Sequence, residues 1–357
     1  MTNNLDLRPL WAAQTIAVVG ATERVGAIGR LPIEYLTKFG FEGFIAPVNP
    51  RGGTILGLPA FQSMAEIPQH IELALIMVPA SSVREAVKDC AAAGVDVAIV
   101  MSSGFGEVDP DGQIAQQELV DIARADGMRL VGPNCIGSVG GAHRVMATFS
   151  PVFSSESTPL PAGNVALVSQ SGALGFGALS LGLERGVPIG IAITTGNEAD
   201  VTATEVAAQL AQDPEVDAVV MYVEALGNMD QLIRVAGSKP IAILKAGRSV
   251  AGAAAAASHT GALASPDKVV SAVLTQNGIA RANNIDELLD IAALFASEKK
   301  ILGPAVGIVT TSGGSGILAV DALESEGLSL AELSAETVTA LEEIVPSYGN
   351  ATNPVDV

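Results

Sequence analysis

Short, unbroken apolar runs that end in glycine, serine, asparagine or proline recur along the chain and limit the folds it can adopt. The N-terminal part contains "TIAVVGAT", "FIAPVNP", "LALIMVPA", "VAIVMSSGFGE" and "RLVGPNC". Helical patterns lie between several runs, as in residues 81–93, which start at a serine and stop at Gly94. Because the apolarity is continuous rather than alternating, both faces of the strands are expected to be covered. The sequence therefore predicts an α/β fold, with a parallel doubly wound sheet over residues 1–145.

The same rhythm restarts twice further along the chain. After the Ser/Pro-rich linker "SPVFSSESTPLPAG", a second α/β unit is predicted over residues 146–298, and a third begins at residue 299. Residues 165–175 align without gaps on residues 306–316, which predicts two copies of one domain type. A doubly wound domain needs about five strands, so residues 299–357 are expected to be an incomplete domain, either a fragment or one finished elsewhere.

Composition excludes several classes of protein. The chain has 357 residues, 49% of them hydrophobic, enough for more than one core. Its formal net charge of −19 opposes binding to nucleic acid and to anionic membranes. No apolar run approaches the roughly 20 residues that span a bilayer, and no signal-peptide pattern opens the sequence. With two cysteines, we expect a cytoplasmic protein that binds neither membrane nor nucleic acid.

The first candidate binding loop follows the first apolar run. Gly20, Gly26 and Gly29 do not have the G-x-G-x-x-G spacing of a dinucleotide loop, which disfavours an NAD dehydrogenase. A strand-to-helix turn at Gly20, with Thr22 and Arg24 nearby, could still receive phosphates at a helix N-terminus. A plain tight turn of a Rossmann-like domain explains the glycine equally well.

Two further turns, "SQSGALG" and "TSGGSGI", each place Ser-Gly between an apolar strand and a helix. Such a helix N-terminus binds anions. One alone is weak evidence, but two in homologous units indicate a pair of phosphate sites. Phosphate that passes between them would need a carrier.

His259 is the candidate carrier, because a neutral imidazole is nucleophilic and its phosphorylated form is a reactive donor. It is one of three histidines and lies within the small-residue stretch "AGAAAAASHTGALA". An ordinary residue at the end of an alanine helix is the alternative. Glu224, at the end of the strand "AVVMYVE", could accept the imidazole N–H, or could be a solvated strand-end acid. Cys135 in "GPNCIG" is interpreted as a buried thiol rather than a nucleophile.

Taken together, "APVNP", "IMVPA", "SSGFGE", "GPNCIG", "SQSGALG", "SHTGALA" and "NPVD" resemble, in this order, the NDP-forming acyl-CoA synthetase family. That family includes the α subunit of succinyl-CoA synthetase and ADP-forming acetate–CoA ligases. The resemblance spans essentially the whole chain. It implies a CoA-binding Rossmann-like domain followed by flavodoxin-like domains, the last of them incomplete. An ATP-grasp domain on the same chain or on a β subunit, in a homo- or hetero-oligomer, would bind ATP and Mg²⁺.

The resemblance also assigns roles to residues. His259 would be the phosphorylated histidine and Glu224 the acid that steadies it. Phosphate would bind at Ser169, Gln170, Ser171, Gly172, Ala173, Gly196, Asn197, Gly313 and Gly314. CoA would bind at Gly20, Thr22, Arg24, Asn49, Val78, Pro79, Ser102, Ser103, Gly104, Phe105 and Asn134. The resemblance implies no metal site within this chain.

The implied reaction forms an acyl-CoA from a carboxylic acid, CoA and ATP, through phosphohistidine and an acyl phosphate. Gln170 stands where the succinate enzyme has arginine, and "SHTGALA" also differs from that enzyme, so the acetate-type branch fits better. A CoA-dependent lyase on the same scaffold, or the regulatory CoA-binding part of an acetyltransferase fusion, are the alternatives. The sequence does not name the acid.

Overall fold

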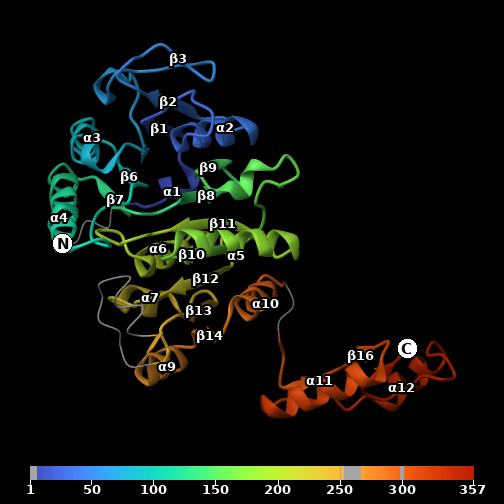
Figure 1. Cartoon of the computed structure of the whole chain (residues 1–357). Helices are drawn as coiled ribbons and strands as arrows, with labels where there is room; N and C mark the ends of the chain where they lie inside the picture. Colours follow the sequence, from blue (N-terminus) through green and yellow to red (C-terminus); the bar gives the residue numbers. More distant parts are fainter. Residues whose placement is uncertain (1–5, 250, 253–266, 298–300) are drawn as a thin grey trace. The chain divides into compact units, whose positions relative to one another are not determined.

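The computed structural model describes residues 6–249, 251–252, 267–297 and 301–357. The chain divides into two compact units, Met1–Ala296 and Ser297–Val357. The first unit is built around two large sheets (Figure 1). Within the described residues, no helix is long and apolar enough to cross a membrane.

The first sheet is fully parallel, as the continuous apolar runs predicted. Its strands lie in the order β2 (Phe44–Val48), β1 (Thr15–Val19), β5 (Leu73–Ile76), β6 (Val97–Val100) and β7 (Arg129–Val131). Every residue of β5 and β6 is buried. The chain leaves β1 toward β2 and later returns to β1's other side as β5. In parallel sheets the ligand crevice lies at this reversal of strand order, outside the carboxyl ends of the strands.

Among the described residues, one short α-helix precedes the first of these strands in the sequence, and three α-helices connect the strands. They are α1 (Pro9–Ala12), α2 (Leu31–Lys38), α3 (Ala80–Ala92) and α4 (Pro110–Ala125), with a small antiparallel hairpin of β3 (Thr54–Ile55) and β4 (Leu58–Pro59). Helix α3 begins one residue before the predicted serine start, because Pro79 occupies the capping position. Proline can hold that position because it leaves no backbone N–H unpaired there.

The second sheet is mostly parallel. Its strands lie in the order β14 (Ala280–Ala282), β13 (Ile241–Lys245), β12 (Ala218–Val223), β10 (Val165–Ser169), β11 (Ile189–Thr194), β8 (Gly137–Gly140) and β9 (Val145–Thr148). Strands β8 and β9 form an antiparallel hairpin, and β8 also pairs antiparallel with β11. This hairpin crosses the boundary proposed at residues 145 and 146. The boundary stays a prediction, and both strands of the hairpin belong to the second sheet.

Helices cover the second sheet as well: α5 (Gly172–Glu184), α6 (Ala203–Leu210), α7 (Asp230–Val235), α9 (Asp267–Gln276) and α10 (Ile285–Phe295). Its strand order reverses between β10 and β12, which gives this sheet its own ligand crevice. The α/β fold with parallel sheets is thus confirmed.

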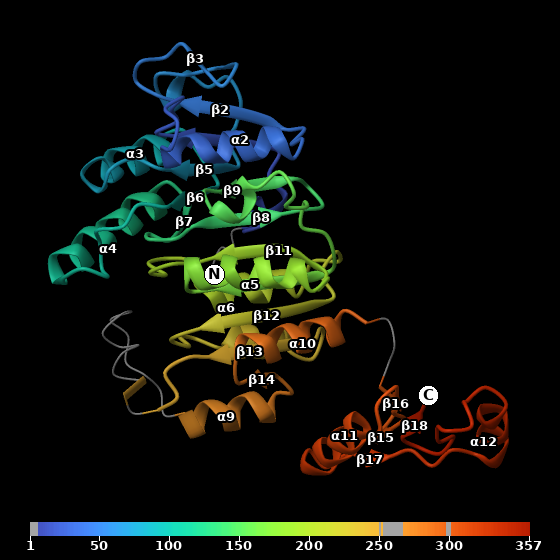
Figure 2. The same cartoon turned by 45° about the vertical axis from the view of Figure 1, so that its right-hand side comes forward.

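One hydrophobic core joins the two sheets of the first unit. Figure 2 shows α2 next to the hairpin β8–β9, and the two elements are in contact. The ring of Phe153 lies between them and α5, with ring centroids 6.0 Å from Tyr35 and 6.2 Å from Phe176, both edge-to-face. Such pairs add stabilisation beyond the area they bury. The two crevices are therefore held in a fixed relation.

The second unit is smaller. Strand β15 (Ala305–Val306) pairs with β17 (Ser329–Leu330), and β16 (Val309–Thr310) pairs with β18 (Val355–Asp356). Its helices are α11 (Gly313–Ser325) and α12 (Ala335–Glu342).

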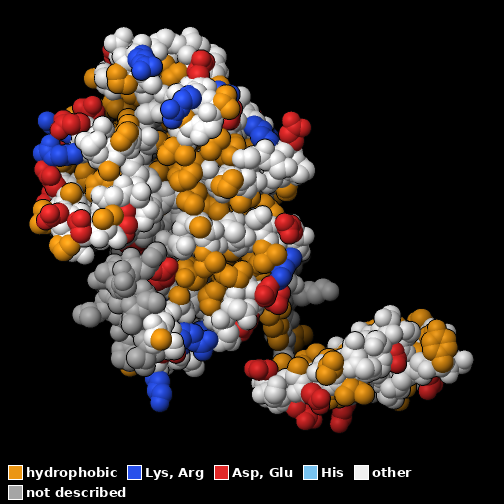
Figure 3. Space-filling model, viewed as in Figure 1, with side chains coloured by type: hydrophobic (Ala, Val, Ile, Leu, Met, Phe, Trp, Pro, Cys, Tyr) orange, Lys and Arg blue, Asp and Glu red, His pale blue; other side chains and the backbone are white. Residues whose placement is uncertain are grey.

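The surface of the protein is rich in acidic residues. Figure 3 shows acidic side chains spread over the visible surfaces of both units, in keeping with the net charge of −19 of the whole chain.

Candidate functional site

A cavity of about 870 Å³ lies in the first unit, where the carboxyl-end loops of the two sheets face each other. Predicted CoA residues line it from the first sheet: Gly20, Thr22, Arg24, Val78, Pro79, Ser102, Ser103 and Asn134. Predicted phosphate residues line it from the second sheet: Gln170, Ser171, Gly172, Ala173, Gly196 and Asn197, together with Glu224. Both strand-order reversals open into this cavity, which explains why residues far apart in sequence meet there.

The turn after β1 brings backbone close to the cavity. Gly20 has a φ of +93°, and a Cβ there would lie 2.9 Å from the carbonyl oxygen of Met77. A Cβ on Gly29 would lie 2.3 Å from the carbonyl oxygen of Gly20. Glycine is required at both positions, since a side chain at Gly20 would push the turn away from the residues that follow β5 and a side chain at Gly29 would collide with the turn itself. Because Gly20 and Gly29 carry no side chains, a ligand can come close to the backbone of this turn, which we call the Gly20 cradle.

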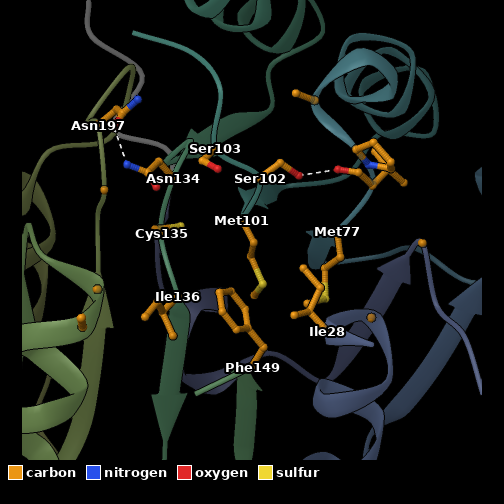
Figure 4. Close-up of a pocket in the computed structure, with 18 of the residues that line it drawn as sticks. Ile28, Met77, Met101, Ser102, Ser103, Asn134, Cys135, Ile136, Phe149 and Asn197 are labelled. Carbon is orange, nitrogen blue, oxygen red and sulfur yellow. Dashed lines mark hydrogen bonds between the residues drawn. The ribbon is translucent and has the colours of Figure 1, made fainter. Parts of the chain in front are cut away.

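Loops after β6 and β7 form the adjoining wall (Figure 4). The hydroxyl of Ser102 donates to the carbonyl oxygen of Val78 at 2.5 Å. Asn134 has a φ of +60°, and its side-chain amide donates to Asn197 Oδ1 at 3.2 Å. Asn197 in turn donates to Glu107 Oε2 at 2.6 Å. The two sheets are thus linked by hydrogen bonds across the cavity wall.

The turn after β10 leads into α5. Ser169 is buried, and its hydroxyl donates to the carbonyl oxygen of Ser171 at 2.7 Å. Ser171 caps the helix, its hydroxyl accepting from the backbone N–H of Leu174 at 3.4 Å. A Cβ on Gly175 would lie 2.7 Å from Ser169 Cβ, so the helix packs directly on the turn. The N-terminus of α5, with its unpaired N–H groups and favourable dipole, faces the cavity at Gly172 and Ala173.

The side-chain amide of Gln170 is fully hydrogen-bonded inside the protein. Its Nε2 donates to Glu198 Oε2 at 2.9 Å and to the carbonyl oxygen of Ala225 at 2.7 Å. Its Oε1 accepts from the backbone N–H groups of Glu224, at 2.6 Å, and Ala225, at 2.9 Å. The backbone N–H of Gln170 donates to the carbonyl oxygen of Tyr222. Gln170 therefore holds the Glu224 segment in place, and its direct contact with phosphate stays a prediction.

Glu198 is a lining residue that sequence reasoning missed. Its Oε1 accepts from the hydroxyl of Thr195 at 2.8 Å and from the backbone N–H of Ala203 at 2.7 Å. Burial raises the pKa of this carboxyl, and the hydrogen bonds from Ala203, Thr195 and Gln170 offset part of that rise. It anchors Gln170 and so belongs to the support of Glu224. Its position could have indicated a role at the site, because Glu198 directly follows the predicted site residues Gly196 and Asn197 in "TTGNEAD".

Glu224 follows β12 and faces the cavity. The hydroxyl of Tyr222 donates to Glu224 Oε1 at 3.5 Å, and burial together with the Glu224 charge raises the pKa of Tyr222 to about 12. Tyr222 therefore stays protonated as a donor. Lys245, at the end of the neighbouring strand β13, is buried, and burial lowers its pKa.

The second unit repeats the stereochemistry of the Ser-Gly turn. Thr310 Oγ1 donates to the carbonyl oxygen of Ser312 at 3.0 Å, and Ser312 caps α11 with its hydroxyl 3.5 Å from the N–H of Ser315. Gly313 and Gly314 open α11. A Cβ on Gly313 would lie 3.2 Å from Asp356 Oδ2, so a carboxylate stands beside this turn. The gap-free alignment thus corresponds to a repeated local structure.

Other predicted residues lie elsewhere. His259 is outside the described residues. Asn49 does not line the cavity but supports it, since its Nδ2 donates to the carbonyl oxygen of Ala21 at 2.8 Å. The N–H of Gly104 donates to Glu107, and the Phe105 ring is buried in a core cluster. Ser169 lies beneath the turn that it supports. The CoA and phosphate roles of these residues stay predictions.

An apolar end of the cavity was also missed. It is formed by Ile28, Met77, Met101, Ile136 and Phe149 (Figure 4). Ile136 adjoins Cys135 in "GPNCIG", but apolar residues carry no chemical signature in a sequence. Burial raises the pKa of the Cys135 thiol to about 12, which keeps it protonated and agrees with its interpretation as a non-nucleophile.

Three family models match the chain. They are described as a CoA binding domain over residues 14–141, a succinyl-CoA ligase like flavodoxin domain over residues 162–295, and a Ligase-CoA domain over residues 306–357. The fold expected from the resemblance is confirmed by these matches, in the expected order. The domain limits at residues 1–145, 146–298 and 299–357 remain our own.

Similar proteins cover nearly the whole chain. Acetate–CoA ligase [ADP-forming] I subunit alpha of Pyrococcus furiosus is 37% identical, over 99% of this chain and 77% of its own length. 4-Hydroxybutyrate–CoA ligase [ADP-forming] of Nitrosopumilus maritimus is 31% identical, over 98% of this chain and 50% of its own length. The chain thus spans about half of the longer relative.

A solved structure also matches nearly the whole chain. It is the dinucleotide-forming acetyl-coenzyme A synthetase 1 of Ca. Korarchaeum cryptofilum, in complex with phosphate and ADP. It is 32% identical, with a TM-score of 0.90, over 98% of this chain and 75% of that one.

Proposed function

The chain belongs to the NDP-forming acyl-CoA synthetase family, and from this membership we propose that it is the CoA-binding, phosphoryl-transferring part of an acyl-CoA synthetase. The complete enzyme would convert a carboxylic acid, CoA and ATP into acyl-CoA, ADP and phosphate. The observation that carries the proposal is the cavity. The Gly20 cradle and the N-terminus of α5 line one space, so a thiol and an acyl phosphate would meet there.

The residues around the cavity fit CoA. The Gly20 turn leaves room for backbone contact with a phosphate, and Arg24 supplies a positive charge at the rim. Ser102, Ser103 and Asn134 offer polar groups along the wall. We assign these residues, with Thr22, Val78 and Pro79, to CoA binding, with residues 1–145 as the domain that holds it.

Phosphoryl transfer is assigned to the second sheet. His259 would accept the γ-phosphoryl group of ATP and pass it to the substrate carboxylate, with Glu224 accepting the imidazole N–H. The N–H groups of Gly172 and Ala173 would stabilise charge on the phosphoryl oxygens. CoA thiol then attacks the acyl carbonyl, the C–S bond forms, the C–O bond to phosphate breaks, and phosphate leaves. The turn at Gly313 and Gly314 is assigned to a second phosphate site.

ATP and Mg²⁺ are assigned to an ATP-grasp domain that completes the enzyme, either on the same polypeptide or as a β subunit. The support is that relatives include both a named α subunit and a chain about twice as long as the matched segment. We propose a cytoplasmic homo- or hetero-oligomer.

Product analysis tests the proposal. With the ATP-grasp part present, ATP, CoA and a panel of carboxylic acids are expected to give acyl-CoA with equal amounts of ADP and phosphate. Release of AMP, cleavage of an acyl-CoA into two carbon fragments, or transfer of an acetyl group to a protein would each contradict it. The last two products would identify the lyase and the acetyltransferase regulator.

Replacing Gln170 by alanine is expected to lower kcat by about 10–100-fold while the Kd for CoA stays within about threefold. The variant removes both the anchor of the Glu224 backbone and a partner of Glu198. Steady-state kinetics and calorimetric titration with CoA measure the two quantities. Gln113→Ala, on the exposed side of α4, is the matched control. An equal loss of kcat and CoA affinity would show that Gln170 has a general structural role instead.

A further inference from the structure

The cavity has one apolar end whose size and chemistry bear on the substrate. Figure 4 shows the Met101 and Phe149 side chains pointing toward one another, between Ile136 and Met77. All four residues line the cavity. Met77 and Met101 follow strands of the first sheet, whereas Ile136 and Phe149 flank the hairpin of the second, so the apolar end is built at the junction of the two sheets.

Ile136 connects this apolar end to the reacting atoms. A Cβ on Gly172 would lie 2.6 Å from Ile136 Cγ1 and 3.0 Å from its Cδ1, so the Ile136 side chain packs against the first residue of α5. Under the proposed function, the phosphate of the acyl phosphate binds at that N-terminus. The acyl group bonded to it therefore begins beside Ile136, and its next carbons extend toward Phe149.

Charge at the cavity argues against a second carboxylate. Among the described lining residues, Arg24 carries the one positive charge, and it lies on an exposed loop at the rim. Glu198 and Glu224 are the lining acids. A dicarboxylic acid would have to place an anion against Ile136, Phe149 and Met101 with no cation among them, and burial of an unpaired charge is costly.

We propose that Ile136, Phe149 and Met101 bind the acyl group and select monocarboxylic acids with a branched or aromatic apolar chain over acetate and over dicarboxylic acids. The inference rests on the proposed function, because it takes α5 as the phosphate end of the substrate. One methylene group in an apolar pocket changes kcat/KM by about tenfold or more. 3-Methylbutanoate is therefore expected to exceed acetate by at least about tenfold, and succinate to fall below acetate.

The test uses the complete enzyme with its ATP-grasp part. The kcat/KM values for acetate, 3-methylbutanoate, phenylacetate and succinate are measured by ADP release, and the Kd values of acetyl-CoA and 3-methylbutanoyl-CoA by calorimetry. Equal values for acetate and 3-methylbutanoate, or a preference for succinate, would overturn the inference. If no acid is activated but 3-methylbutanoyl-CoA still binds at least about tenfold tighter, the inference stands and the proposed function fails. If neither activation nor this difference in Kd is found, both fail.

Variants identify the residues. Ile136→Ala and Met101→Ala are each expected to reduce the preference for 3-methylbutanoate over acetate by about tenfold, because kcat/KM for 3-methylbutanoate falls further than kcat/KM for acetate. Ile114→Ala makes the same kind of truncation at an exposed site on α4 and is expected to leave the preference unchanged. A loss that is equal for all acids in both variants would mean that these side chains have no role in selection.

Discussion

An enzyme in which alanine replaces His259 is expected to take up no labelled phosphate from ATP and to lose acyl-CoA formation by more than about 10⁴-fold. A covalent carrier has no substitute within the reaction, since the phosphoryl group must be bonded to a nucleophile between its two sites. CoA affinity is expected to persist, because the described CoA wall comes from the first sheet. Radiolabelled γ-phosphate, followed by acid and base treatment, measures the phosphohistidine.

The matched control is His70→Ala. The ring Nε2 of His70 lies 2.8 Å from Asp96 Oδ2 at an exposed position, and the residue does not line the cavity. This variant is expected to keep full labelling and full activity. If the His259→Ala enzyme were labelled as strongly as the His70→Ala enzyme, the carrier would be another residue, and the phosphate path through α5 would need another donor.

Much of the fold could be predicted because its strands are covered on both faces. β5 and β6 are apolar at every position, and this continuous pattern predicts a parallel sheet without any knowledge of partners. The hairpin β8–β9 was not predicted. Its sequences, "GSVG" and "VMAT", contain small and polar residues. Strand β8 forms because β11 pairs with it, and β9 in turn pairs with β8. A partner as distant in the sequence as β11 cannot be recognised from the local sequence.

The candidate site was predicted unevenly for a similar reason. The turns at Gly20 and Ser171 carry local signals, a glycine with positive φ and a helix cap, and the structure brings them to one cavity. The role of Gln170 could not be predicted, because it depends on the direction in which its side-chain amide points. Its partners Glu198 and Ala225 are 28 and 55 residues away. These residues meet because the strands that carry them are neighbours in the sheet. The strand order, and not the separation in sequence, therefore decides which side chains come into contact, and no spacing pattern reveals it.

Replacing Asp200 by alanine is expected to lower the free energy of unfolding of the first unit by about 3–5 kcal/mol. The Asp200 side chain is fully buried and accepts from Arg129 Nε at 2.9 Å, from the N–H of Leu130 at 2.9 Å and from Arg124 Nε at 2.9 Å. Alanine would leave a buried backbone N–H unpaired and would remove a charge partner of Arg129. Glu205 would still bind Arg129, which places the loss toward the lower end of that range.

Urea unfolding followed by the fluorescence of Trp11 measures this loss, because the chain has one tryptophan and it is buried in the first unit. Burial alone would raise the pKa of Asp200, but the hydrogen bonds from Arg129 and Leu130 and the nearby positive charges outweigh it, so the pKa is lowered. The stabilisation is therefore present above the ordinary aspartate pKa of 3.8 and disappears as the pH falls through the lower folded value. The stability difference between wild type and Asp200→Ala should shrink over that acidic window.

Asp121→Ala, on the exposed face of α4, is the control and should show no such difference in stability from wild type at any pH. Arg129 lies in β7 of the first sheet, Arg124 lies in α4 just before that strand, and Asp200 lies in the loop that follows β11 of the second sheet. A constant difference at all pH values would therefore mean that the two sheets are held together by packing rather than by this ion-pair network.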